Sequence, residues 1–208
     1  MELLLIRHAL PVRRELSVGR ADPELSPDGN AQTAHLAEYL AAEHLDAVYS
    51  SPLRRAQQTA SPVATRFGLA VSMAVGVAEW DQNSPEYVPV EELKAAGDPR
   101  WQEMLDGVWS SDEPEHEFRA RVLDTIEGII DAHAGEKVAV VCHGGVINAY
   151  LANVLSLGNA GERGFFYPNY TSINRVAAAR SGQRSIVTVN ETSHLRNTGL
   201  PMGLFQRG

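Results

Sequence analysis

Two apolar segments of the chain each end in a histidine. His8 follows the run from Leu3 to Arg7, and His143 follows the run from Val138 to Cys142. Both runs are typical of buried strands in an α/β sheet, where ligands bind outside the carboxyl ends of the strands, so the two imidazoles can converge on one crevice. A single histidine at a strand end is more often a structural hydrogen-bonding group. The pair, with its matched setting, indicates a functional site.

The neighbours of these histidines favour an anion. Arg7 precedes the first histidine, and Gly144-Gly145 follows the second at a predicted helix start, where free backbone N–H groups and the helix dipole attract negative charge. Another strand end, at Ser51, leads into a helix that carries Arg55 in its first turn. A guanidinium binds two phosphate oxygens at once and keeps its charge at any working pH. The residue types therefore predict a site for a phosphoryl group.

The overall charge is negative, but the positive charge is concentrated. The 208 residues carry a formal net charge of −8, which disfavours a general nucleic-acid surface, because such a surface is basic. Arginines gather in residues 7–20 and at 54–55, as expected for a protein with a small anionic ligand. Apart from Arg7 and Arg55, they are interpreted as solvated loop residues: Arg13, Arg14, Arg20 and Arg54.

The order of the predicted elements is that of a layered α/β fold. The predicted strands are 3–6, 45–51, 70–75 and 137–142, and the predicted helices are 27–43, 52–67, 118–133 and 144–155. This alternation argues for parallel strands, and two tail segments, 172–178 and 185–189, form an antiparallel edge hairpin. Ser26 is the expected N-cap of the first helix, with Pro27 at its first position.

The length and the apolar content fit one domain, 1–208. Within it, residues 79–112 are irregular and rich in Pro, Asp, Glu and Trp, and they are predicted to form a substrate-facing excursion or lid with one helix inside. The apolar run at the N-terminus is too short for a signal peptide, and no later run reaches membrane-spanning length. A cytoplasmic protein without membrane contact is therefore expected.

In their order and spacing, the motifs resemble those of the histidine phosphatase superfamily, which has the phosphoglycerate mutase-like fold. The matching segments lie throughout the chain: Leu5-Ile6-Arg7-His8; Asp22-Pro23-Glu24-Leu25-Ser26 with Gly29 and Gln32; Ser51-Pro52-Leu53 with Arg55-Ala56 and Thr59-Ala60; Ala78-Glu79-Trp80; Phe118-Arg119-Ala120-Arg121-Val122; His143-Gly144-Gly145; and Tyr170-Thr171-Ser172-Ile173. The resemblance implies a three-layer α/β/α sandwich with a mostly parallel central sheet and an antiparallel edge strand. It also implies a phosphatase that needs neither a metal nor a cofactor.

The same resemblance implies roles for the matching residues. His8 would be the nucleophile that forms a phosphohistidine, and Glu79 would be the proton donor, with Asp81 as the alternative. The phosphoryl oxygens would be bound by His8 and by four further residues of the matching motifs, which would also balance charge in the transition state: Arg7, Arg55, His143 and Gly144.

The loop after His8 departs from the family pattern. The usual glycine is replaced by Ala9, and groups that often help to hold phosphate are replaced by other residues: Leu10, Pro11 and Arg14. This loop is then expected to hold phosphate differently, with Arg13 or Arg14 as the candidate contact. His194 resembles a C-terminal element of many members and is assigned no role.

Several other chemistries are excluded. A cysteine phosphatase needs the pattern Cys-x5-Arg, but Asn148 stands where the arginine would follow Cys142. The seven histidines show no paired helical spacing, and neither a zinc-site pattern nor a Walker-type loop is present.

Two alternatives to hydrolysis stay open. One is cofactor-dependent phosphotransfer of the phosphoglycerate mutase type, although the 79–112 segment is shorter than the insertion that such mutases carry. The other is binding of phosphorylated ligands without catalysis. In each case the expected partner is a small phosphomonoester or inorganic phosphate, and a homodimer is left open.

Overall fold

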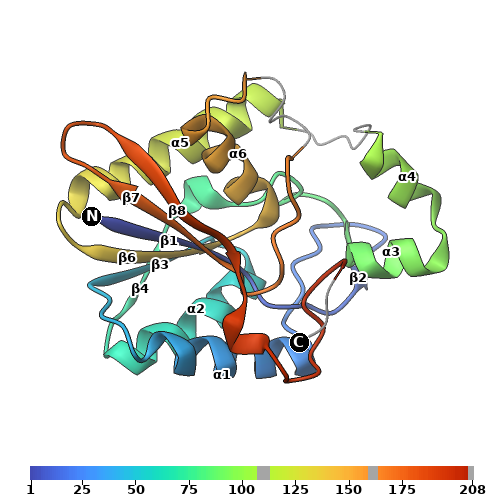
Figure 1. Ribbon diagram of the computed structural model, residues 1–208. Helices are drawn as coiled ribbons and strands as arrows, with labels where there is room; N and C mark the ends of the chain where they lie inside the picture. The colour runs from blue at the N-terminus through green and yellow to red at the C-terminus, as the bar shows by residue number, and fades with distance from the viewer. Residues whose placement is uncertain (107–112, 159–163, 206–208) are drawn as a thin grey trace.

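The computed structural model describes residues 1–106, 113–158 and 164–205. Its centre is a six-stranded sheet with the strand order β4-β3-β6-β1-β7-β8 (Figure 1). The parallel strands are β1 (Glu2–Arg7), β3 (Ala47–Ser50), β4 (Val71–Met73) and β6 (Lys137–Cys142). β7 (Ile173–Ala178) and β8 (Arg184–Glu191) are antiparallel and complete one edge. The predicted mostly parallel sheet with an antiparallel edge is confirmed.

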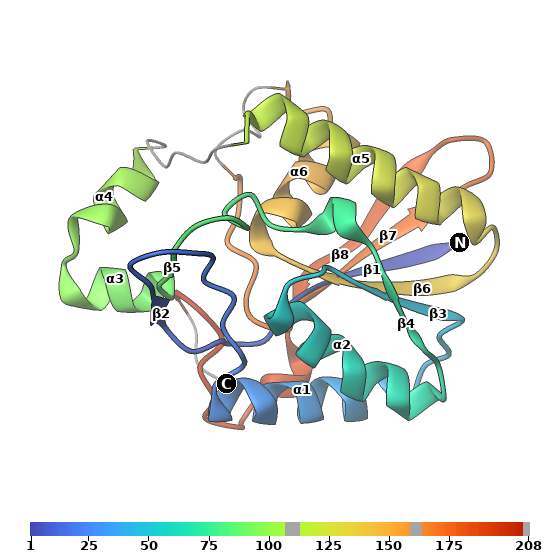
Figure 2. The ribbon, with the colours of Figure 1, turned by 180° about the vertical axis from the view of Figure 1, so that it is seen from behind.

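Helices cover both faces of this sheet. α1 (Pro27–Leu40) and α2 (Arg54–Phe67) lie on one face, and α5 (Glu115–Ala132) and α6 (Gly144–Val154) lie on the other (Figures 1 and 2). Leu3 and Leu5 of β1 belong to the core on the α5 and α6 side, whereas Leu4 and Ile6 belong to the opposite core. Because both faces are buried, the central strands are apolar throughout. The fold is the predicted three-layer sandwich.

The element ends follow from local signals. Ser26 Oγ accepts a hydrogen bond from the Gly29 N–H at 3.0 Å, and Pro27 is the first residue of α1, as predicted. α2 begins at Arg54 rather than at Pro52, and it ends at Gly68, whose φ of 66° lies in the left-handed region that favours glycine. β4 is shorter than the predicted strand 70–75 because residues Val75–Val77 turn into the 3₁₀ helix η1.

The excursion that follows β4 stands beyond the carboxyl ends of the parallel strands (Figure 2). The prediction of one helix inside it is wrong, because residues 79–106 contain both α3 (Val90–Ala96) and α4 (Pro99–Leu105). Gly97 ends α3 with a φ of 63°, and Asp98 caps α4 by accepting a hydrogen bond from the Arg100 N–H at 3.0 Å. Residues 107–112 of the predicted lid lie outside the described residues.

The loop after β1 supports this excursion. Its short strand β2 (Arg14–Glu15) pairs with β5 (Glu86–Tyr87) in a separate two-stranded sheet. The C-terminal part of the chain adds the 3₁₀ helix η3 (Ser193–Leu195), which packs near α1. None of the helices in the described ranges combines the length and the apolar character that crossing a bilayer requires.

Candidate active site

The two predicted histidines lie side by side. β1 and β6 are neighbours in register, with Arg7 opposite Cys142, so the residues that follow them leave the sheet at the same edge. The ring centroids of His8 and His143 are 5.1 Å apart. His8 is 2% exposed and His143 is fully buried. The sheet topology therefore brings together two imidazoles that are far apart in the sequence.

His8 is held as a neutral imidazole with one free nitrogen. Its Nδ1 lies 2.8 Å from the carbonyl oxygen of Ala9. A carbonyl oxygen only accepts hydrogen bonds, so Nδ1 carries the proton and Nε2 keeps its lone pair. Burial, followed by the charges of Arg55 and Arg7, holds the pKa of His8 well below its ordinary value. A neutral imidazole with a free Nε2 can act as a nucleophile.

His143 is oriented by a serine. Its Nε2 lies 2.7 Å from Ser51 Oγ, at the end of β3, while its Nδ1 has no hydrogen-bond partner within the described part of the chain. Burial, followed by Arg55 and His8, also holds its pKa well below the ordinary value. His143 is absent from the residues that line the cavity described below, whereas His8 is among them.

Two guanidiniums are buried beside these histidines. Arg7 is 7% exposed and Arg55 is 2% exposed, and both line the cavity. Arg7 Nη1 donates to the Pro168 carbonyl at 2.6 Å, and Arg55 Nη2 lies 3.5 Å from Asp81 Oδ1. The Nε atoms of both arginines lack a hydrogen-bond partner among the described residues. Buried donors without partners are costly, so their shared location fits an anion that accepts from them.

A helix N-terminus adds backbone donors to the same place. α6 begins at Gly144, directly after His143, and Gly144 lines the cavity. The N–H of Gly145 donates to Glu79 Oε2 at 2.9 Å. A Cβ atom on Gly145 would overlap Glu79 Oε1, whereas one on Gly144 would meet nothing closer than Arg7 Nε at 4.0 Å. A Cβ atom at position 145 would therefore force the Glu79 carboxyl group to move.

Glu79 lines the cavity, and its side chain is half-buried. Burial, followed by the charge of Asp81, raises the pKa of Glu79 above its ordinary value, although the N–H groups of Trp80 and Gly145 oppose the shift. A carboxyl group with a raised pKa can hold a proton nearer neutral pH and donate it. Asp81, the alternative from the sequence, also lines the cavity and pairs with Arg55.

The cavity extends from these groups towards the excursion and has a volume of about 790 Å³. Most of its outer wall is apolar and comes from the excursion, α5 and the segment after α6: Trp80, Val88, Val90, Leu93, Met104, Leu105, Phe118 and Phe166. Arg100 also lines it, but its guanidinium pairs with Glu15, Glu86 and Asp98. The lining of the cavity away from His8 is thus mainly apolar, although Glu115, Arg119 and Asn148 add polar groups to it.

The arginines interpreted as loop residues pair with surface carboxylates. Arg13 lies 2.9 Å from Glu15, and Arg14 lies 3.7 Å from Glu24. Neither Arg13 nor Arg14 belongs to the cavity wall, so the structure gives no support to their role as phosphate contacts. Arg20 and Arg54 likewise pair with carboxylates on exposed parts of the chain.

Three tyrosines pack on the two guanidiniums, and the sequence assigned a role to none of them, although Tyr170 belongs to the segment Tyr170-Thr171-Ser172-Ile173 that resembles the family. Tyr87 packs on Arg55 with 4.6 Å between the guanidinium carbon and the ring centroid. Tyr167 and Tyr170 pack on Arg7 at 4.9 and 4.1 Å. The closely spaced Tyr167-Pro168-Asn169-Tyr170 was the available signal, but nothing local in it shows which cation it contacts.

Two further predicted residues have structural contacts. His194 in η3 is 8% exposed, and its Nε2 lies 2.8 Å from Thr171 Oγ1. Cys142 is buried in β6, and burial raises the pKa of its thiol. Across the residues that the structure describes, no group of three or more His, Cys, Asp or Glu side chains is arranged to hold a metal ion.

The fold and the site together define an α/β protein in which a neutral histidine lies beside two buried guanidiniums at one edge of the central sheet. The chain belongs to the histidine phosphatase superfamily (branch 1), whose sequence profile matches residues 3–192. Phosphoserine phosphatase 1 of Hydrogenobacter thermophilus is 31% identical over 151 residues, which cover 69% of this chain and 71% of that protein. A probable phosphoglycerate mutase of Yersinia enterocolitica is 26% identical over 206 residues, which cover 94% and 95%.

Solved structures share the fold. A phosphoserine phosphatase variant from Entamoeba histolytica, in complex with phosphoserine, is similar with a TM-score of 0.72 and 24% identity, over 93% of this chain and 98% of that chain.

Proposed function

We propose that this protein is a phosphomonoester hydrolase that works through a phosphohistidine on His8. The observation that carries the proposal is the pair of unpartnered buried guanidinium donors beside a neutral histidine. Arg7 Nε and Arg55 Nε lack partners among the described residues, and both side chains line the cavity together with His8. An anionic phosphoryl group would satisfy these donors while His8 attacks it.

In the first step, the Nε2 lone pair of His8 forms a bond to phosphorus while the bond from phosphorus to the ester oxygen breaks. Glu79 donates its proton to the leaving oxygen, so an alcohol departs and a phosphohistidine remains. Arg7, Arg55, His143 and the Gly144 end of α6 balance the charge on the equatorial oxygens.

In the second step, the Glu79 carboxylate takes a proton from water as the water oxygen attacks phosphorus. The bond from phosphorus to nitrogen breaks, orthophosphate forms, and both His8 and Glu79 return to their starting states. No step requires a metal or a cofactor. We favour Glu79 over Asp81 as the proton donor because its pKa is raised, whereas Asp81 is paired with Arg55.

The substrate in this proposal is a small phosphomonoester, in line with the phosphoserine named for the relatives. The mainly apolar outer wall favours a leaving group with apolar surface, because burying that surface is favourable and Arg100 is already paired with three carboxylates. A comparison of kcat/KM for naphthyl phosphate, phosphoserine and 3-phosphoglycerate tests this preference. The preference predicts the highest kcat/KM for naphthyl phosphate.

Phosphate release from a panel of phosphomonoesters tests the proposed activity. We expect the His8→Ala variant to lose activity by a factor on the order of 10³ or more, and the wild type to form an acid-labile phosphoenzyme that this variant lacks. His44→Ala is the matched control, because that side chain is 79% exposed. Undiminished turnover by His8→Ala would refute the nucleophile.

A mutase remains the second candidate because of the Yersinia enterocolitica relative, which is similar over nearly its whole length. Conversion of 3-phosphoglycerate to 2-phosphoglycerate faster than phosphate release would favour it over hydrolysis. Binding of vanadate without turnover of any ester would favour a non-catalytic protein instead.

We further propose that the protein is cytoplasmic and contacts neither membranes nor nucleic acid. The formal charge of −8 and the single cysteine of the sequence support this location.

A homodimer is the assembly to test by light scattering in solution. The exposed apolar residues of the β4 edge, Val71 and Met73, supply a candidate surface.

A further inference from the structure

Glu91, in the first turn of α3, joins the excursion to two tyrosines from the other end of the chain. Its Oε1 accepts a hydrogen bond from the Tyr167 hydroxyl at 2.9 Å, and its Oε2 accepts one from the Tyr170 hydroxyl at 3.2 Å. One carboxylate therefore holds two hydroxyl groups, each on its own oxygen. Hydrogen bonds to a charged acceptor are stronger than those between neutral groups.

The same two tyrosines enclose Arg7. The guanidinium carbon lies 4.9 Å from the Tyr167 ring centroid and 4.1 Å from the Tyr170 ring centroid, and Nη1 donates to the carbonyl of Pro168 between them in sequence. The segment 167–170 thus supplies three contacts that restrict the guanidinium. Among the described residues, Arg7 Nε is left without a partner.

No ion pair within 4.0 Å joins Glu91 to Arg7 among the described residues, although the charge of Glu91 is one of the causes that raise the pKa of Arg7. Both tyrosines contact Glu91 and Arg7, so they connect the two groups physically. The excursion also contacts the other guanidinium, since the ring centroid of Tyr87 in β5 lies 4.6 Å from the guanidinium carbon of Arg55. The excursion therefore contacts, directly or through tyrosines, the surroundings of both cations.

We propose that Glu91 is a positioning residue, which orients Arg7 towards the phosphoryl group by fixing Tyr167 and Tyr170. The proposal rests on the proposed phosphatase function. In this proposal, phosphoryl binding depends on the position of α3, because these contacts form only when the excursion lies against the 167–170 segment. By linkage, a phosphoryl ligand that orders Arg7 also stabilises the contact between α3 and that segment.

The experiment compares Glu91→Ala with Glu92→Ala. Glu92 follows on the same helix, and its side chain is 48% exposed with a 3.7 Å ion pair to Arg13. For Glu91→Ala we expect kcat for p-nitrophenyl phosphate to fall by about tenfold and vanadate inhibition to weaken by a similar factor, since small displacements of a catalytic group are costly. Glu92→Ala is expected to match the wild type, and Glu91→Gln, which keeps one acceptor oxygen, is expected to recover part of the loss.

A double-mutant cycle identifies the route of the effect. Tyr167→Phe combined with Tyr170→Phe keeps both rings on Arg7 and removes only the hydroxyls. If Glu91 acts through them, adding Glu91→Ala to this pair causes little further loss. Full additivity of the two losses, or a Glu91→Ala variant equal to Glu92→Ala in vanadate affinity, would overturn the proposal.

Thermal-shift titration with vanadate separates this proposal from the proposed function. If the wild type binds vanadate but hydrolyses no ester, the phosphatase function fails, while weaker vanadate binding by Glu91→Ala still supports the positioning role. If the wild type is an active phosphatase and the Glu91→Ala and Glu92→Ala titrations coincide, the positioning role alone fails.

Discussion

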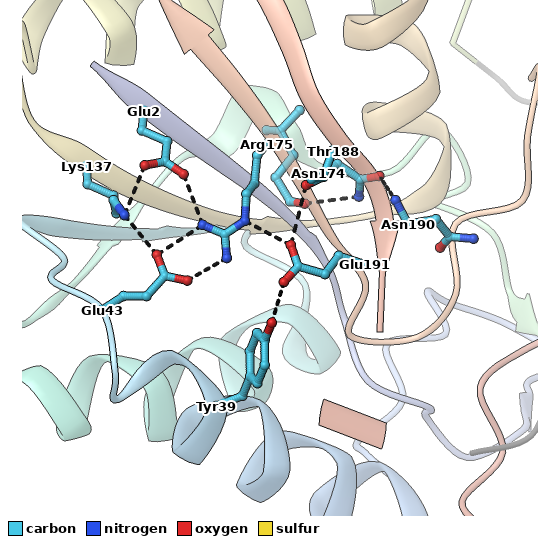
Figure 3. A network of polar contacts seen from close by, with 10 residues as sticks. Glu2, Tyr39, Glu43, Lys137, Asn174, Arg175, Thr188, Asn190 and Glu191 are labelled. Atoms are coloured by element: carbon cyan, nitrogen blue, oxygen red, sulfur yellow. Dashed lines mark hydrogen bonds and ion pairs between the residues drawn. The ribbon is translucent and has the colours of Figure 1, made fainter. Parts of the chain in front are cut away.

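Arg175 on β7 is the centre of an ion-pair network that joins the sheet to α1 and to the segment after it (Figure 3). Its guanidinium contacts Glu2 at 2.9 Å, Glu43 at 2.5 Å and Glu191 at 2.9 Å. The Arg175 side chain is 11% exposed, and the three carboxylates are between 17% and 31% exposed. In an Arg175→Met variant, the three carboxylates lose this cation. Lys137 remains nearby and contacts Glu2 and Glu43.

The size of the effect follows from Glu43. Hydrogen bonding to Arg175, opposed by burial and assisted by Lys137, lowers the pKa of Glu43 from 4.5 to about 2. A carboxylate with this change on folding contributes roughly 3 kcal/mol of stability at neutral pH. Lys137 supplies part of it, so we expect Arg175→Met to reduce the free energy of unfolding by about 2 kcal/mol. For a chain of this length, the melting temperature would fall by roughly 6 °C.

The pH dependence has a definite sign. Because the pKa of Glu43 is lowered in the folded state, its contribution is fully present above the unfolded value of 4.5 and is lost as the pH falls towards 2. The difference between wild type and Arg175→Met should therefore narrow below pH 4.5.

Urea unfolding at neutral pH and at about pH 3.5 measures both effects. Arg66→Met is the control, since its 3.7 Å contact with Glu38 joins side chains that are 51% and 77% exposed. An Arg175→Met variant as stable as this control, or a difference that is constant across pH, would refute the reasoning.

Further expectations concern the site. In Gly145→Ala, the new Cβ displaces the Glu79 carboxyl group. We therefore expect kcat for an alkyl phosphate to fall by about 100-fold while vanadate affinity changes little. An equal loss of kcat and of vanadate affinity would contradict the role of Glu79 as proton donor. The reaction needs a neutral His8 and a protonated Glu79. Because the pKa of His8 is lowered and that of Glu79 is raised, kcat/KM should remain high below the ordinary histidine pKa and should decline as the pH rises through the Glu79 pKa. If the Glu79→Gln variant shows the same decline, Glu79 is not the group that causes it. Mass spectrometry should detect no iodoacetamide adduct on native Cys142, because burial raises its thiol pKa, and rapid labelling of the folded protein would show otherwise.

Much of the central sheet and its histidines could be inferred from local patterns. The apolar runs before His8 and His143 predict strands that are covered on both faces, and β1 and β6 are such strands. Ser26 and Pro27 predict a helix start because a cap involves only residues within one turn. The convergence of the two histidines followed from a general rule of parallel sheets, since the strand ends of neighbouring strands share an edge.

The excursion shows where local patterns were insufficient. Gly97 and Asp98 are residues that commonly end one helix and cap the next, but the composition of the segment did not show that helices would form on both sides of them. The short pairing of β2 with β5 also joins segments far apart in the chain, and strands of two residues leave too brief a pattern to recognise.

The layered α/β class, the main strands and helices, and the residue types available for phosphoryl chemistry could all be inferred from the order of the residues. The partners of the key groups came from the folded chain: Glu79 with Gly145, Glu91 with Tyr167 and Tyr170, and Arg175 with its three carboxylates. This difference follows from the range of the interactions. Strand periodicity and helix caps depend on neighbours within a few residues, whereas buried charge and hydrogen-bond partners are set by how the completed sheet and its loops pack.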